Sequence, residues 1–285
     1  MKPPPFVYHA PATLTEALGL LASLPEARPL AGGQSLMPML NYRLLAPQHI
    51  VDLNRVDGLS FIREENASLV IGAMTRQRDI EKSAVIARRL PVLAEAIGLV
   101  GHRQTRNRGT LGGSLAHLDP SAELPTVAMA MDAELTLQSR DGSRRLKMAE
   151  FATGMLSTAL SSGELLTEVR FQLWQEGHGH AFVEYARRHG DFAVVSAAAL
   201  LEVSASKVKR ASLTLGGVAP TPLRMRNAEA ALVGQELSSE TIATAAVLCA
   251  KVDAMDDPTY PAWYRQKLAV TYARRALEQA WERTR

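Results

Sequence analysis

Cysteine is scarce in this chain of 285 residues, which contains only Cys249. One thiol cannot form a disulfide within the chain, and it cannot supply the roughly four cysteine ligands that hold an iron–sulfur cluster. No apolar run approaches the roughly 18 residues that predict a membrane-spanning helix. The G-x-G-x-x-G and G-x-x-x-x-G-K-[ST] loops are missing as well. Rossmann and P-loop nucleotide sites are therefore not expected.

The sequence also has no long segment in which charged residues of one sign predominate. The net charge is +3, and the 32 basic and 29 acidic residues are interspersed, whereas nucleic-acid-binding domains usually carry a basic stripe. The first residues, Met-Lys-Pro-Pro-Pro, are not followed by the apolar segment of a secretory signal. We therefore expect a cytoplasmic protein with no membrane span and no nucleic-acid partner. A hydrophobic content of 47% indicates a normal core.

The first region, residues 1–55, has the pattern of a small α/β unit. Thr13 and Glu16 have capping-box spacing, and apolar residues then recur at helical intervals. A second helix is predicted through Met39 and Leu44, and Ile50 opens a short buried strand. The pattern predicts that this region forms a lobe of its own.

The middle region, residues 56–176, has the alternation of an antiparallel sheet. Residues 165–173 alternate with period two, which is typical of a strand with two different faces. Asp141 and Gly142 form the residue pair favoured in a type I′ hairpin turn. A helical pattern over residues 80–100 is interrupted at Pro91, which should end or kink a helix.

The last region, residues 177–285, is predicted to form a sheet covered by helices. Strands are expected over 192–203 and 211–216, and helices from near Ser239 and Trp263. Residues 175–180, Gln-Glu-Gly-His-Gly-His, have the composition of a linker before this region.

Two Gly-Gly loops, over residues 30–36 and 108–114, are the features that point to chemistry. Each places two glycines and a short polar residue after an extended segment. Glycine permits positive φ and close approach of a ligand, and successive N–H groups can converge on an anion. Hydroxyl groups of Ser35, Thr110 and Ser114 could donate to phosphate oxygens. One such loop is usually a plain turn, but two suit a pyrophosphate held from both sides.

Five segments occur in the order typical of one family: PLAGGQSLMPMLNYRLLAPQHIVDLNRV (29–56), RNRGTLGGSLAHLDPSAELPTVAMAMDAEL (106–135), GELLTEV (163–169), YARRHGDFAVVSAAA (185–199) and LGGVAPTPLR (215–224). The chain thereby resembles the FAD-binding medium subunits of the carbon monoxide dehydrogenase and xanthine dehydrogenase family of molybdenum hydroxylases. It is most similar to those of bacterial N-heterocycle hydroxylases. The resemblance implies an α+β fold with a two-lobed (PCMH-like) FAD-binding region and a C-terminal α+β domain.

The resemblance also implies the cofactor contacts, position by position. They are Leu30, Ala31, Gly32, Gly33, Gln34, Ser35, Leu36, Val100, Thr110, Gly112, Gly113, Ser114, His117, Glu123, Leu166 and Phe192. Relatives usually carry Asp at the position of Glu123, and several carry Tyr at that of Phe192. A cofactor-lining Lys of relatives aligns near Glu184, which puts that contact in doubt here. Asp119, before Pro120, is either a further cofactor residue or a turn-initiating Asp.

The implied partners are a large subunit with the molybdenum cofactor and a small subunit with two [2Fe–2S] clusters, joined as a dimer of heterotrimers. Electrons would pass from the clusters to FAD on this chain and then to an external acceptor. No nucleophile–base pair has convincing spacing, so no catalytic residue is assigned. The alternatives are a self-contained FAD oxidase of the vanillyl-alcohol-oxidase-like class and a nucleic-acid-binding module.

Two clusters of polar residues carry weaker hypotheses. Arg103, Arg106 and Arg108 would assist the pyrophosphate, form interface salt bridges or simply face solvent. His178 and His180 have the spacing of a metal pair, but no third ligand is near them in the sequence and no metal site is predicted.

Overall fold

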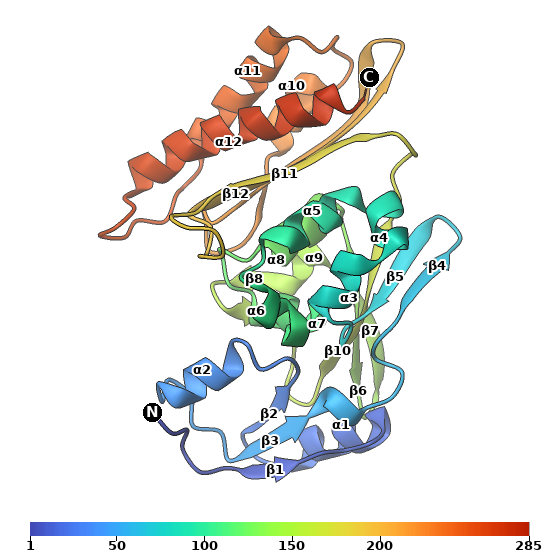
Figure 1. Cartoon of the computed structure of the whole chain (residues 1–285), viewed down its shortest axis with the longest axis vertical. Coiled ribbons are helices and arrows are strands. Elements are labelled where there is room, and N and C mark those ends of the chain that lie inside the picture. Colours follow the sequence, from blue (N-terminus) through green and yellow to red (C-terminus); the bar gives the residue numbers. More distant parts are fainter. Residues whose placement is uncertain (285) are drawn as a thin grey trace.

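The computed structural model describes residues 1–284, and its main sheets follow one another along the long axis of the molecule (Figure 1). The strands are β1 (Val7–His9), β2 (Ala27–Leu30), β3 (His49–Asp52), β4 (Ile62–Glu65), β5 (Ser68–Gly72), β6 (Glu134–Ser139), β7 (Gly142–Lys147), β8 (Ala152–Gly154), β9 (Ser157–Thr158), β10 (Leu165–Gln172), β11 (Gly179–Tyr185), β12 (Val195–Ser204), β13 (Lys207–Gly216) and β14 (Leu223–Arg224). The helices are α1 (Leu14–Ser23), α2 (Leu36–Asn41), α3 (Gln77–Lys82), α4 (Ala84–Arg89), α5 (Pro91–Leu99), α6 (Arg103–Arg108), α7 (Leu111–His117), α8 (Glu123–Ala130), α9 (Met148–Phe151), α10 (Arg226–Leu232), α11 (Ser239–Val247) and α12 (Ala262–Glu282), with 3₁₀ turns at Leu53–Arg55 and Leu248–Lys251. The mixture of helix and strand confirms the predicted α+β class.

The N-terminal part is a parallel sheet of order β1-β3-β2 with α1 and α2 beside it. The predicted helix start is confirmed, because the Thr13 hydroxyl accepts the Glu16 N–H at 3.2 Å and the Glu16 carboxylate accepts the Ala12 N–H at 3.0 Å. The second helix is shorter than predicted. It ends at Asn41, and Arg43 has φ +57°, a left-handed conformation that a continuing helix does not allow, so Leu44 lies outside it.

The middle part is an antiparallel sheet of order β4-β5-β10-β6-β7. The alternating segment forms its central strand, β10, with Val169 and Phe171 fully or almost fully buried. The β6–β7 hairpin forms, but the predicted turn is wrong by one residue. Ser139 pairs with Gly142, so Arg140 and Asp141 make the loop, and neither has the positive φ of a type I′ turn.

Helices α3 to α8 pack beside this sheet (Figure 1). Pro91 occupies the first position of α5, where its missing N–H costs no hydrogen bond, so the predicted interruption is confirmed. A large apolar core joins α3, α4, α5, α7 and α8 to β5, β6 and β10. None of the helices in the described part of the chain is long and apolar enough to cross a membrane.

The C-terminal part is an antiparallel sheet of order β11-β12-β13-β14. The long helix α12 covers one face of it, and α5 and α8 contact the other (Figure 1). The predicted linker is partly strand: β11 begins at Gly179, where an added Cβ would lie 2.0 Å from the carbonyl oxygen of Ala280 in α12. The strand predicted from Phe192 begins at Val195, and α10 was not predicted.

Candidate cofactor-binding site

A cavity of about 710 Å³ lies where the two Gly-Gly loops meet, and its volume is within the range of about 300–1,000 Å³ that is usual for ligand pockets. The structure places almost all predicted contact residues in its wall: Ala31, Gly32, Gly33, Gln34, Ser35, Leu36, Val100, Thr110, Gly112, Gly113, Ser114, His117, Asp119, Glu123, Leu166 and Phe192. Leu30 is not part of the wall. It is the last residue of β2, and its side chain packs beneath Gly33.

The first loop presents free backbone donors to this cavity. Within residues 1–284 no acceptor is found for the backbone N–H groups of Gly32, Gly33, Gln34 and Ser35. Gly33 has φ +72°, a left-handed conformation that allows consecutive N–H groups to converge. Such a run of unsatisfied N–H groups is the geometry of an anion-binding nest.

The second loop differs from the prediction that both loops present backbone donors. The N–H of Gly112 donates to the carbonyl of Ala73 at 2.8 Å, and that of Leu111 to Thr75 at 3.1 Å. The N–H of Gly113 donates to the Thr110 hydroxyl at 3.0 Å, which caps α7. Since these amides are already used, this loop offers the cavity space and the Ser114 hydroxyl rather than a second set of N–H donors.

Glycine is required in both loops because the backbone segments touch. A Cβ at Gly32 would lie 2.2 Å from the carbonyl oxygen of Arg108, and a Cβ at Gly112 would lie 2.5 Å from the Cβ of Ala73. Neither position has room for a side chain. Gly32 therefore sets how closely the two loops approach, Gly112 lets the second loop pack on Ala73 just after β5, and Gly33 supplies the conformation of the first turn.

A polar clasp, formed by Asn54 and Arg76, ties the loops together. The Asn54 side-chain amide donates to the carbonyl of Ala31 at 3.0 Å, and the Arg76 guanidinium donates both to Asn54 Oδ1 at 2.5 Å and to the carbonyl of Arg108 at 2.7 Å. The clasp thus joins one residue of each loop. Sequence reasoning missed it, since the residues are separated by more than 20 positions and neither belongs to a glycine motif.

Replacing Arg76 with lysine is expected to weaken cofactor binding by about tenfold, which corresponds to about 1.4 kcal/mol. A lysine ammonium lacks the planar fork that lets one guanidinium donate to Asn54 and to the Arg108 carbonyl together. Fluorescence titration of the apo-protein with FAD measures the change. Arg88→Lys, on the exposed end of α4, is the matched control and should bind as the unmodified chain does; equal affinities of all three proteins would contradict the role of the clasp.

The arginine cluster does not line the cavity. Arg106 is buried, forms an ion pair with Glu81 at 2.9 Å and donates to the carbonyl of Val100 at 3.0 Å. This ion pair holds the pKa of Glu81 below its ordinary value. Arg103 and Arg108 are exposed. The hypothesis that this cluster assists the pyrophosphate is not supported by the geometry of Arg106, whose guanidinium is occupied by structural contacts.

The acidic wall of the cavity comes from the segment around the start of α8. The Asp119 carboxylate accepts the Ser121 N–H at 2.9 Å, so this residue does form the predicted turn while it also faces the cavity. Glu123 is only 5% exposed. Burial, together with the negative charges of the nearby Glu184 and Asp119, raises the pKa of Glu123 to about 8.

Several polar and apolar wall residues were not predicted. Gln77, almost fully buried, contributes to the wall, but its unpaired side-chain oxygen Oε1 is itself buried and lies against Gly109. Leu156 and Leu160 come from the β8–β9 segment and its exit. Phe192 lies on an exposed loop, with 64% of its surface accessible, and forms the rim rather than the floor.

The remaining candidate groups are structural. Cys249 is fully buried, and burial raises the pKa of its thiol to about 12, so it is an apolar core residue. Burial, with help from Arg283, lowers the pKa of His180 to about 4. No group of three or more His, Cys, Asp or Glu side chains in residues 1–284 could hold a metal ion.

Comparison with known proteins identifies the family of the chain. Residues 4–174 match the family model described as the FAD binding domain in molybdopterin dehydrogenase, and residues 180–280 match the CO dehydrogenase flavoprotein C-terminal domain. The chain is 42% identical to the 6-hydroxypseudooxynicotine dehydrogenase complex subunit alpha of Paenarthrobacter nicotinovorans, over 100% of this chain and 97% of that protein.

Two further relatives cover both chains almost completely. The carbon monoxide dehydrogenase medium chain of Hydrogenophaga pseudoflava is 37% identical, over 99% of each chain. The solved structure of quinoline 2-oxidoreductase from Pseudomonas putida 86 superimposes with a TM-score of 0.96 at 36% identity, over 100% of each chain.

The fold and the cavity define an FAD-binding flavoprotein component of an oxidoreductase. The chain belongs to the family of FAD-binding medium subunits of molybdenum hydroxylases, which includes those of carbon monoxide and xanthine dehydrogenases and of N-heterocycle hydroxylases. The predicted family, fold type and cofactor are thereby confirmed. Of the two flavoprotein alternatives left by the sequence, the family match supports the subunit of a larger complex.

Proposed function

We propose that this chain is the electron-transfer subunit of a heterotrimeric molybdenum hydroxylase. It would receive electrons from the [2Fe–2S] clusters of a small partner subunit and pass them to an external acceptor, while substrate is hydroxylated on a large molybdenum subunit. The observation that carries the proposal is the run of free backbone N–H groups from Gly32 to Ser35 in a cavity large enough for a dinucleotide. The single buried cysteine supports it, since this chain cannot hold the clusters itself.

The residues of the cavity fit FAD in two respects. The nest at Gly32–Ser35 offers donors to the negatively charged pyrophosphate. The apolar wall at Val100, Leu166 and Phe192 suits an aromatic ring. We propose all the residues predicted from the resemblance as FAD contacts, except Leu30, which lies outside the wall.

When bound, FAD supplies the redox chemistry, and this chain binds, orients and shields it. The two loops would hold the pyrophosphate where they approach each other at Gly32. The exposed Phe192 would leave part of the cavity rim accessible to an acceptor or a partner. We further propose the three-part division 1–55, 56–176 and 177–285, a dimer of heterotrimers and a cytoplasmic location.

The purified chain is expected to bind one equivalent of FAD and to become yellow, with the absorbance near roughly 450 nm that is generic for flavins. ADP should compete with FAD, because it carries the pyrophosphate that the nest recognises, while riboflavin should bind much more weakly. The isolated chain should hydroxylate no heterocycle. Isolation of the native complex should yield two further chains, one with molybdenum and one with iron–sulfur clusters. A colourless chain that cannot be reconstituted with FAD would overturn the proposal.

A further inference from the structure

One face of the C-terminal sheet packs against the FAD-binding part. Near the cavity this face carries a row of polar residues that includes the paired Glu184 and Ser196. Phe182, Ala198 and Leu200 on this face belong to the same apolar core as α5 and α8. Because side chains alternate along a strand, Glu184 and Ser196 lie on that face as well. The neighbours Ala181 and Val183 pack on the other face, against α12.

Strand pairing aligns this row with the start of α8. Glu184 pairs with Ser196, and Ser196 pairs with Gly216. A Cβ at Gly216 would lie 2.3 Å from the Thr126 hydroxyl and 2.5 Å from the Ser196 hydroxyl, so α8 lies directly on the row. Glu123 precedes Thr126 by three residues and therefore lies on the same side of the helix. The row thus brings the carboxyl groups of Glu123 and Glu184 into one buried region beside the cavity.

No cation balances these two carboxyl groups. In residues 1–284 neither forms an ion pair, and Glu184 Oε2 is buried without a hydrogen-bond partner. Arg265 lies on the opposite face of the sheet, where it binds Asp257 and backbone carbonyls. The other charged or titratable groups on the adjoining segments are Asp119 and His117 before α8, Glu95 of α5 with its partner Arg283, and Arg187, Arg188, His189 and Asp191 after β11.

The buried Glu123 and the half-buried Glu184 have no counter-ion among the described residues, and they cannot both ionise readily at neutral pH. Burial raises the pKa of Glu123 to about 8 and that of Glu184 to about 7, and the two groups repel each other's negative charge. Their protons are therefore lost in two steps that belong to the pair and not to either residue. At least one of the two carboxyl groups carries a proton near pH 7.

We propose that Glu184 acts as a positioning residue for Glu123: it adds to the effect of burial in keeping that carboxyl group protonated, so that the wall of the FAD cavity offers an O–H donor instead of a negative charge. Glu123 faces the cavity, whereas Glu184 lies behind it and acts only through it. The inference rests on the proposed function, since the group that the donor would meet is FAD. FAD is itself negatively charged, so loss of the proton removes a hydrogen bond and adds repulsion.

The expected result is an FAD dissociation constant that rises with pH above about 7, by at most tenfold per pH unit while one proton is linked to binding. In Glu123→Gln, which keeps an uncharged donor, this pH dependence should disappear. In Glu184→Gln the midpoint of the profile should move to lower pH, because Glu123 loses a negative neighbour, and Glu184→Asp should restore it. Fluorescence titration between pH 5.5 and 9 measures these profiles, with pH steps of about one unit sufficient to resolve a one-proton linkage.

Glu95→Gln is the matched control. Glu95 is half-buried, burial raises the pKa of its carboxyl group, and it contacts the same strand through the Phe182 N–H at 2.9 Å, but it does not line the cavity. Its FAD profile should match that of the unmodified chain. A pH profile unchanged in Glu123→Gln, or a midpoint unmoved in Glu184→Gln, overturns the inference.

Infrared spectra of the apo-protein separate this inference from the proposed function. The C=O band of a protonated carboxyl group should persist at pH 7, decline as the pH rises, and be absent in the double variant Glu123→Gln, Glu184→Gln. If FAD does not bind but this band titrates as expected, the proposed function is wrong and the protonated state of the carboxyl pair is supported. If FAD binds but the band is missing at pH 7, the proposed function is supported and the inference about the carboxyl pair is wrong.

Stability gives a second check with a definite sign. Both acids have a higher pKa in the folded chain than in the unfolded one, so the folded state binds more protons above about pH 4.5 and stability falls as the pH rises toward 8. His178 and His180, whose pKa is lowered by burial, act in the opposite direction and only below their ordinary range near 6.5. The fall in the urea midpoint between pH 7 and 8.5 should therefore be smaller in Glu123→Gln than in the unmodified chain, and an equal fall would count against the pair.

Discussion

Replacing Gly32 with alanine is expected to weaken FAD binding at least tenfold and to lower the free energy of unfolding by about 1–3 kcal/mol, the usual cost of overpacking. The added methyl group would lie 2.2 Å from the carbonyl oxygen of Arg108 and 2.8 Å from the Cα of Gly109. Both are backbone atoms and cannot rotate away. The loops would have to separate, which would stretch the Asn54–Arg76 clasp and displace the N–H groups that face the cavity.

Gly98→Ala is the control for this substitution. Gly98 lies in α5, nothing stands within 4 Å of an added Cβ, and alanine in a helix is worth roughly 0.5–1 kcal/mol over glycine. This variant should bind FAD normally and unfold at slightly higher urea concentration. Normal FAD affinity in Gly32→Ala would show that FAD binding does not depend on the close contact between the two loops.

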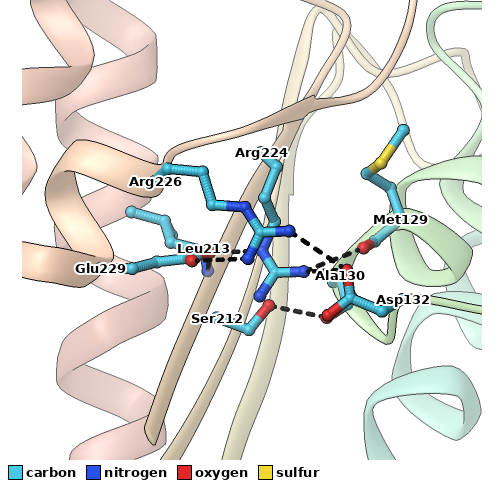
Figure 2. A network of polar contacts seen from close by, with 8 residues as sticks. All are labelled: Met129, Ala130, Asp132, Ser212, Leu213, Arg224, Arg226 and Glu229. Carbon is cyan, nitrogen blue, oxygen red and sulfur yellow. Dashed lines mark hydrogen bonds and ion pairs between the residues drawn. The ribbon is translucent and has the colours of Figure 1, made fainter. Parts of the chain in front are cut away.

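Removing the Glu229 carboxylate is expected to have the largest effect on stability, about 3–5 kcal/mol, because the buried Arg224 keeps only the more exposed Asp132 as a counter-ion and the buried Leu213 N–H loses its acceptor. Figure 2 shows the network that joins the C-terminal sheet to the end of α8. Glu229 pairs with the Arg224 guanidinium and accepts the Leu213 N–H at 2.8 Å. Arg224 also pairs with Asp132 at 2.9 Å, and its side chain is only 9% exposed. Glu229→Ala should therefore lower the urea midpoint sharply.

The comparison that identifies the cause is a double variant. Glu229→Leu with Arg224→Met removes both charges and should cost less than Glu229→Ala alone, since no uncompensated charge remains. Glu278→Gln breaks an exposed i,i+4 pair with Arg274 in α12 and should change the free energy by about 0.5 kcal/mol or less. A Glu229→Ala variant as stable as Glu278→Gln would refute the importance of the network.

The features that the sequence predicted correctly depend on neighbours along the chain. The Thr13 cap, the break at Pro91 and the alternating strand β10 each follow from a few consecutive residues. The Gly-Gly loops were found for the same reason, and the family resemblance supplied the wall residues that lie between them.

What the sequence could not show is which polar groups are already in use. Whether the N–H of Gly112 is free depends on Ala73, almost 40 residues earlier, and the clasp joins Asn54 to Arg76 across the fold. Glycines at 177 and 179 suggested a linker, but Gly179 is small because α12 passes over it. In each case the role of a residue depends on a contact with a residue far away in the sequence, and such a contact cannot be predicted from the neighbouring residues.

The apolar core described above crosses the boundary between the two family models, since Phe182, Ala198 and Leu200 are packed into it with α5 and α8. The two family matches show how the sequence is related to other proteins, but they do not show that the two parts unfold separately. A fragment cut between residues 174 and 180 would expose the inner side of its own core and leave the Ala130 carbonyl without the Ser212 hydroxyl that binds it at 2.7 Å. The FAD-binding and C-terminal parts are thus expected to unfold as one cooperative unit. A destabilising substitution in the C-terminal part, far from the cavity, is therefore also expected to release the flavin.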